Sequence, residues 1–189
     1  MYVGARIPND YVVVSGSGQT SFGPGIDPWE TAAYDLALLD AGIENCNIVE
    51  YTSVLPLKAR EISLRDANAL GLMTHGMVLE CIKAQVNGTQ GQHICAGVGR
   101  AEVWDEEGEQ IGGFAAEYEG YGSTRLAEQK LTEALRGIFR RRYAGKGYRL
   151  GDMTFTTKDL VVDEQYGTVL VALGFVTFYM AAFRSPRGA

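Results

Sequence analysis

Cysteine and histidine are scarce in this sequence. The 189 residues contain three cysteines, at positions 46, 81 and 95, and two histidines. The cysteines are odd in number and have no C-x-x-C spacing, so the sequence predicts neither a disulfide framework nor a zinc site. This usage favours a reducing compartment. We therefore expect a cytoplasmic protein that works without a metal ion.

Excess positive charge and long membrane-type segments are also missing. The formal net charge of −6 argues against nucleic acid and anionic membrane surfaces as partners, but it is compatible with a cationic ligand. The first ten residues lack the apolar stretch of a signal peptide. The longest apolar run, Gly167 to Phe183, is at the short limit for a membrane helix and is rich in strand-forming residues. We expect it to be a buried strand.

Glycine, by contrast, is abundant. The 24 glycines indicate many tight turns between short strands. A strand is predicted at 11–15, and the segment Gly16-Ser17-Gly18 after it is interpreted as the start of a flexible loop. Further strands are predicted at 72–86, 92–104, 111–118 and 153–162, and the segment 57–71 is left open between a strand with a turn and a marginal helix.

Two helices are predicted from capping residues and apolar periodicity. The first runs from about 28 to 41, with Asp27 suited to the N-cap and Gly42 to the C-terminal stop. The second runs from 124 to 142, after Ser123 as its cap. The buried stripe of the first helix is expected to contain Ala32, Ala33, Leu36, Leu39 and Ile43.

These elements predict an α+β fold with mainly antiparallel sheet, formed by residues 1–189 as a single domain. No internal repeat or linker divides the chain. The last strand is apolar on both faces, which requires a covering layer above and below it.

The stretch from Asn45 to Pro56 predicts a strand that runs into a corner. Proline cannot donate to a strand ladder, so the strand should stop near Pro56. Two hydroxyl residues, Thr52 and Ser53, lie at the corner. From the local pattern alone they are two ordinary residues at a strand end.

Two segments of the sequence indicate a functional role for this corner. The segment YDLALLDAGIENCNIVEYTSVLP, residues 34–56, and the motif EYEG, residues 117–120, resemble the pyruvoyl-dependent arginine decarboxylases. The opening segment IPNDYVVVSGSGQT is a weaker match. The resemblance implies that Ser53 attacks the carbonyl of Thr52, so that the chain cleaves itself into 1–52 (β chain) and 53–189 (α chain). A pyruvoyl group generated from Ser53 would then head the α chain. Position 52 is often Ser in the family and is Thr here.

The resemblance also implies roles for other residues. Glu117 matches the proton donor, Asn47 matches a residue tied to processing and to oxyanion stabilisation, and Asp35 matches the residue that faces the guanidinium of the substrate, with Leu38 beside it in the substrate-binding set. Taken without the resemblance, Asp35 is a solvated helix-edge residue, Asn47 a turn or strand-end residue, and Glu117 an acid at a solvated strand end.

The activity implied is decarboxylation of L-arginine to agmatine and carbon dioxide. The covalent pyruvoyl group would be the electron sink, with no metal and no pyridoxal phosphate. A four-layer α/β/β/α sandwich and a homotrimer with active sites between subunits are further implications. Two alternatives stay open: a pyruvoyl decarboxylase of another amino acid, such as histidine or aspartate, and an unprocessed, non-catalytic trimeric interaction protein.

Overall fold

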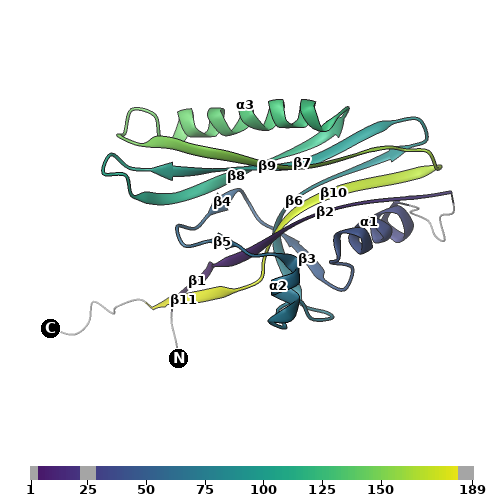
Figure 1. Ribbon diagram of the computed structural model, residues 1–189, viewed down its shortest axis with the longest axis horizontal. Helices are drawn as coiled ribbons and strands as arrows, with labels where there is room; N and C mark the ends of the chain where they lie inside the picture. Colours follow the sequence, from purple (N-terminus) through teal and green to yellow (C-terminus); the bar gives the residue numbers. More distant parts are fainter. Residues whose placement is uncertain (1–3, 22–28, 183–189) are drawn as a thin grey trace.

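The computed structural model, which describes residues 4–21 and 29–182, has four layers (Figure 1). One long helix covers a four-stranded sheet, which packs on a five-stranded sheet covered by two shorter helices. This confirms the predicted α/β/β/α sandwich. The helices are α1 (Tyr34–Ala41), entered through a π-helical turn η1 (Trp29–Ala33), α2 (Leu64–Ala69) and α3 (Thr124–Arg142). The strands are β1 (Gly4–Pro8), β2 (Asp10–Thr20), β3 (Asn47–Glu50), β4 (Val54–Leu55), β5 (Arg60–Glu61), β6 (Val78–Thr89), β7 (His93–Trp104), β8 (Gln110–Tyr121), β9 (Arg149–Val161), β10 (Tyr166–Phe175) and β11 (Phe178–Ala182).

The two large sheets are mainly antiparallel. The five-stranded sheet has the order β3-β6-β10-β2-β5, and the four-stranded sheet has the order β4-β8-β7-β9. Only the short pairs β3–β6 and β2–β5 are parallel among the pairings described. A separate two-stranded ribbon, β1 with β11, extends from the body (Figure 1).

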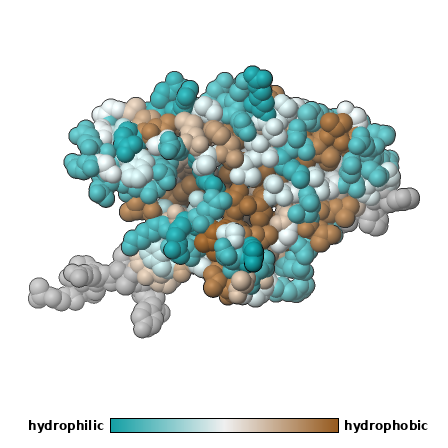
Figure 2. All heavy atoms as spheres, viewed as in Figure 1, coloured by the Kyte–Doolittle hydropathy of each residue, from teal (hydrophilic) through white to brown (hydrophobic). Residues whose placement is uncertain are grey.

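Three apolar clusters hold the four layers together. The first lies between the two sheets and includes Ile82, Val98 and Leu173. The second fills the space between the five-stranded sheet and the helices α1 and α2. The third packs α3, through Leu131 and Leu135, on the four-stranded sheet. On the face seen in Figure 2, apolar residues are visible in the middle, between the two sheet layers.

Most predicted elements are present, with shifted boundaries. The helix α3 matches 124–142, and Ser123 is its N-cap residue, although its side chain makes no capping hydrogen bond. The open segment 57–71 contains both a strand, β5, and a helix, α2. The strand predicted from 72 begins only at Val78. The apolar tail is two strands, β10 and β11, and not one.

The interpretation of Gly16-Ser17-Gly18 as a loop is wrong, because β2 continues to Thr20. The two glycines allow α1 to lie directly on the strand. A Cβ at Gly16 would be 2.0 Å from the main-chain oxygen of Ala37, and a Cβ at Gly18 would be 2.3 Å from that of Ala33. The glycines therefore mark a close helix–strand contact.

This contact also corrects the predicted buried stripe of the first helix. Leu36 and Leu39 are 40% and 57% exposed. The buried side is formed instead by a row of small residues with one leucine: Ala33, Ala37, Leu38 and Ala41. Small side chains face the sheet because the glycine-lined strand leaves no room for larger ones. Two leucines of α1 are consequently left on the molecular surface. The Asp27 cap lies outside the described residues.

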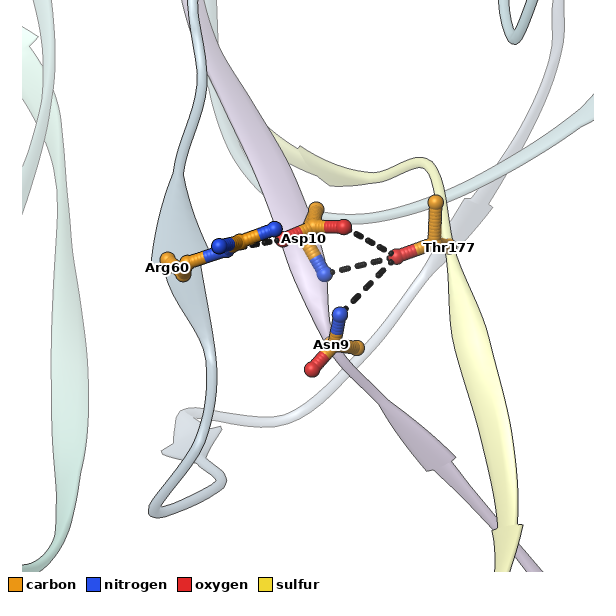
Figure 3. Close-up of polar contacts among 4 residues, drawn as sticks. All are labelled: Asn9, Asp10, Arg60 and Thr177. Atoms are coloured by element: carbon orange, nitrogen blue, oxygen red, sulfur yellow. Dashed lines mark hydrogen bonds and ion pairs between the residues drawn. The ribbon is translucent and has the colours of Figure 1, made fainter.

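A buried carboxylate ties the start of β2 to two distant segments (Figure 3). Asp10 is 8% exposed and accepts hydrogen bonds from Arg60 Nε at 2.7 Å and from Thr177 Oγ1 at 2.8 Å. Thr177 Oγ1 in turn accepts from the Asp10 main-chain N–H at 2.9 Å and from Asn9 Nδ2 at 3.3 Å. The hydrogen bond from Arg60 lowers the pKa of Asp10, with Thr177 contributing in the same direction and burial opposing it. The cluster thus joins residues on both sides of the predicted cleavage point.

We expect Asp10→Asn to lower the free energy of unfolding by about 1–3 kcal/mol at pH 7, the usual loss for a hydrogen-bonded buried charge. A depressed folded-state pKa stabilises the protein above the ordinary aspartate pKa, and this stabilisation disappears as the pH falls through the folded-state value. The difference between wild type and variant should therefore shrink from pH 7 towards pH 3. Urea unfolding at several pH values measures it. Asp163→Asn, at an exposed position, is the control, and a difference independent of pH would contradict the assignment.

Candidate functional site

The Thr52–Ser53 peptide lies where the chain crosses from one sheet to the other. The Tyr51 N–H donates to the Cys81 carbonyl of β6 at 2.8 Å, in the five-stranded sheet. The Ser53 carbonyl accepts from the Ala115 N–H of β8 at 2.8 Å, in the four-stranded sheet. Thr52 alone separates these two anchors, and it is exposed. The predicted corner is therefore a bridge between two sheets, fixed on both sides.

Side-chain packing explains why the bridge forms here. Ile48 packs on the core beneath α1, whereas Tyr51 packs between the sheets, where its ring is 5.8 Å from that of Phe175. Leu55, after the bridge, is 9% exposed in the same inter-sheet core. Apolar residues on either side of Thr52 and Ser53 thus hold the two hydroxyl residues at the surface.

The acidic motif lies beside the bridge on β8. Residues two apart on a strand face the same side, so Ala115, Glu117 and Glu119 share one face of β8. This face points to the five-stranded sheet, because Ala115 belongs to the inter-sheet core and Glu119 Oε1 accepts from the Gln85 N–H of β6 at 2.9 Å. Glu117 lies between these two residues, about 7 Å along the strand from the residue that binds the Ser53 carbonyl. The structure therefore brings Ser53 and Glu117 to the same opening between the sheets.

The surroundings of Glu117 favour its protonated form. Desolvation by the protein raises the pKa of its carboxyl group, and the negative charges of Glu119 and Glu50 raise it further. The main-chain N–H of Glu117 partly opposes this by hydrogen bonding to the carboxylate. The residue keeps an exposed surface in the single chain. Glu117 thus combines access to a ligand with a raised pKa, as a proton donor requires.

Asn47 lies at the far end of β3 from the bridge. Its Nδ2 donates to the Gly76 carbonyl at 3.0 Å, and its main-chain N–H donates to the Met77 carbonyl at 2.8 Å. The extended chain between Asn47 and Ser53 spans about 20 Å. Within one chain the structure therefore does not bring Asn47 to the Thr52 carbonyl.

The two predicted substrate-binding residues lie on α1 and differ in exposure. Asp35, in the first turn of the helix, is exposed and points a carboxylate to solvent. Leu38 is 9% exposed and belongs to the core between α1 and the sheet. In the single chain, Asp35 is accessible to a ligand, and Leu38 acts mainly by holding the helix in place.

Lys83, which the sequence pattern does not single out, lies close to Glu50, Gln85 and Tyr34. The side chain of Lys83, on β6, is 10% exposed. Its Nζ is 3.0 Å from Glu50 Oε1, donates to Gln85 Oε1 at 2.6 Å, and lies 5.3 Å from the ring centre of Tyr34. The available signal was one lysine within an otherwise mostly apolar strand, which usually marks a solvated position.

A separate cavity of about 230 Å³ opens beyond the bridge, next to Leu55 and Pro56. Its lining includes Tyr11, Arg100 and Asp152, and none of the candidate residues Thr52, Ser53, Glu117, Asn47, Asp35 and Leu38. Arg100 is already bound to Glu61 and to Thr154 Oγ1. The candidate residues therefore lie outside this cavity.

Within residues 4–21 and 29–182, no three His, Cys, Asp or Glu side chains form a metal-binding group. No helix of the same residues is long and apolar enough to cross a membrane. The three cysteines are free thiols. The pyruvoyl group that the resemblance implies would come from Ser53, whose carbonyl accepts from the Ala115 N–H.

Comparison with known proteins gives consistent matches. The sequence model of the family described as pyruvoyl-dependent arginine decarboxylase (PvlArgDC) matches residues 10–180. The chain is 35% identical to "Pyruvoyl-dependent arginine decarboxylase AaxB" of Chlamydia trachomatis serovar L2, over 96% of this chain and 97% of the relative. The protein of the same name from Chlamydia caviae is 34% identical over 94% and 95% of the two chains. "Pyruvoyl-dependent arginine decarboxylase 2" of Archaeoglobus fulgidus is 31% identical over 67% of this chain and 78% of its own.

Proposed function

Because the chain belongs to the pyruvoyl-dependent arginine decarboxylase family, we propose that it converts L-arginine to agmatine and carbon dioxide after cutting its own backbone between Thr52 and Ser53. One observation carries this proposal. The Thr52–Ser53 peptide is the bridge between the two sheets, and it lies beside a glutamate whose pKa is raised.

The maturation step uses groups that the chain itself supplies. Ser53 Oγ attacks the carbonyl carbon of Thr52, and the amide becomes an ester as the bond to the Ser53 nitrogen breaks. Elimination then releases Thr52 as a carboxylate and leaves dehydroalanine at position 53. One water molecule hydrolyses this group, ammonia leaves, and a pyruvoyl group remains. Attachment of the bridge to both sheets supports the first step, because it fixes the main chain on both sides of the Thr52 carbonyl.

The two fragments are expected to stay together after cleavage. The β chain contains β2, which pairs along its length with β10 of the α chain, from Thr20–Tyr166 to Tyr11–Phe175. It also contains α1, packed against that sheet, and Asp10, bound to Arg60 and Thr177 of the α chain. Cutting the surface bridge leaves these contacts intact.

In the mature enzyme we assign the turnover roles to the pyruvoyl group and to two side chains, and the processing role to a third side chain. The pyruvoyl group supplies the electron sink for decarboxylation. The carboxylate of Asp35 pairs with the substrate guanidinium, for which a bidentate geometry is available. Glu117, whose raised pKa favours the protonated form, returns a proton to the α-carbon after carbon dioxide has left. Asn47 is assigned to the oxyanion formed during processing, with its amide as donor.

The distance between Asn47 and Ser53 supports a homotrimer in which neighbouring subunits complete each site. Apolar side chains near the candidate residues point to the same arrangement. Leu36, Leu39, Val49 and Val54 are between 40% and 58% exposed, on α1, β3 and β4. Apolar surface of this kind is commonly covered by another subunit.

Asp35→Asn tests the substrate assignment. Loss of a charge-assisted pair should raise the KM for arginine about 30–100-fold, which corresponds to about 2–3 kcal/mol, while cleavage at Ser53 proceeds unchanged. Steady-state kinetics and intact-mass measurement on the same preparation give both values. Glu44→Gln, after α1, is the matched control. Equal loss of cleavage and of arginine binding would contradict the assignment. A gain of decarboxylase activity towards another amino acid would favour a different substrate.

A further inference from the structure

Lys83 occupies an unusual position for a lysine. Its side chain is 10% exposed although ammonium groups rarely leave water. Its methylene stem packs on the α1 side of β6, the side on which Leu79 and Cys81 lie in the core. Its ammonium group is paired with Glu50 Oε1 at 3.0 Å and donates a hydrogen bond to Gln85 Oε1 at 2.6 Å. A buried cation with two specific partners has a defined position.

The contacts of Lys83 connect the parts of the proposed active site. Glu50 is the last residue of β3, directly before Tyr51 and the bridge. Gln85 accepts from Lys83 through its side chain, and its main-chain N–H donates to Glu119 of β8 at 2.9 Å. On the third side lies the ring of Tyr34, the first residue of α1, which precedes Asp35.

The contacts along one edge of β6 show where this network lies. Tyr51 binds the Cys81 carbonyl, and Glu119 binds the Gln85 N–H, four residues further along the strand. Lys83 is midway between these two attachment points. After Tyr51, which is bonded to Cys81 of β6, the bridge crosses to β8. Glu117 lies on β8, two residues before Glu119.

We propose that Lys83 is a positioning residue for the proton-donor site, which holds Glu50 beside the bridge and balances its negative charge next to Glu117. The inference rests on the proposed function of Glu117. The titratable groups that neighbouring elements bring to this network are Glu119 on β8, Glu50 on β3 and Tyr34 on α1. Burial lowers the pKa of Lys83, but its bonds to Glu50 and Tyr34 outweigh this and keep the group charged.

The two members of the ion pair then have opposite effects on Glu117. Glu50 raises the pKa of Glu117, and the positive charge of Lys83 offsets Glu50. Lys83→Met leaves Glu50 unbalanced, so Glu117 should lose its proton at higher pH. Glu50→Gln removes a negative charge, so Glu117 should lose its proton at lower pH. Damage to packing alone would not produce shifts of opposite sign.

The test is the pH dependence of kcat for arginine in fully processed Lys83→Met, Glu50→Gln and the double variant. We expect the limb at which activity falls with rising pH to move up by about 0.4 pH unit in Lys83→Met and down by about as much in Glu50→Gln, as for charges several ångströms apart near a surface. The double variant should lie between them. Lys130→Met, which removes an ion pair with Glu133 on the distant helix α3, is the control and should leave the limb in place.

Two further outcomes separate this inference from the function on which it rests. If the limb disappears in Glu117→Gln but does not move, or moves in one direction only, in the Lys83 and Glu50 variants, the inference is wrong and the proton-donor role stands. If the limb survives unchanged in Glu117→Gln, the proton-donor role is wrong and the inference is overturned with it. Glu50 is 63% exposed, so its variant is expected to fold normally.

Discussion

Ser53→Ala is expected to give a single uncleaved chain whose arginine decarboxylase activity is reduced to background. Alanine has no hydroxyl to attack the Thr52 carbonyl, so neither the new chain end nor the pyruvoyl group can form. The Ser53 main chain is held by its carbonyl, through Ala115, and the side chain is not needed for that contact. The variant should therefore fold like the wild type. Mass spectrometry and release of labelled carbon dioxide measure the two effects.

Thr52→Ala is the matched control for this result. The attacked group at position 52 is the main-chain carbonyl, so the side chain can be removed without removing the electrophile. We expect this variant to cleave, at an altered rate, and to decarboxylate arginine once cleaved. Cleavage of Ser53→Ala, or an uncleaved Ser53→Ala chain with wild-type activity, would contradict the assigned chemistry.

Glu117→Gln is expected to reduce kcat about 10²–10⁴-fold while the chain still cleaves into its two fragments. Glutamine keeps the shape of the side chain but cannot donate an acidic proton to carbon. In the wild type, activity should fall as the pH rises through the pKa of Glu117, because the ionised carboxylate is no longer a donor. That pKa is raised by burial and by the nearby acids, so the fall should lie above the ordinary glutamate value of about 4.3.

Glu119→Gln is the control for Glu117→Gln, because it makes the same substitution at the neighbouring glutamate of the same strand face. Its side-chain oxygen can still accept from the Gln85 N–H, so the contact between the sheets is kept. We expect a much smaller loss of kcat than in Glu117→Gln, with the limb shifted to lower pH because one negative charge has gone. A larger loss of kcat in Glu119→Gln than in Glu117→Gln would contradict the assignment and make Glu119 the proton donor.

The fold was largely predictable where local signals and burial agree. The helix α3, the apolar strand β10 and the corner at Thr52 and Ser53 follow from periodicity, composition and Pro56. The helix α1 was predicted with the wrong buried face. Apolar periodicity assigns its leucines to the core, but the glycines of β2 select small residues by close contact. Such a contact between distant segments cannot be seen from the helix alone.

The site was predictable only in part for the same reason. A resemblance to a family identified Ser53 and Glu117, and the structure places both at one opening between the sheets. It does not bring Asn47 there within one chain, because the whole of β3 lies between them. Lys83 was missed because a lysine in a strand ordinarily faces water. Its burial depends on Glu50, Gln85 and Tyr34, which come together only in the folded chain.

The most direct test of self-cleavage is the intact mass of the purified protein, measured when fresh and after incubation. We predict two species, residues 1–52 and residues 53–189, of which the larger lacks a free amino terminus and is lighter by one ammonia molecule than the same fragment with an N-terminal serine. Conversion to these species should parallel the rise of decarboxylase activity. A chain that keeps the mass of all 189 residues, yet releases carbon dioxide from labelled arginine at the full rate, would contradict this prediction.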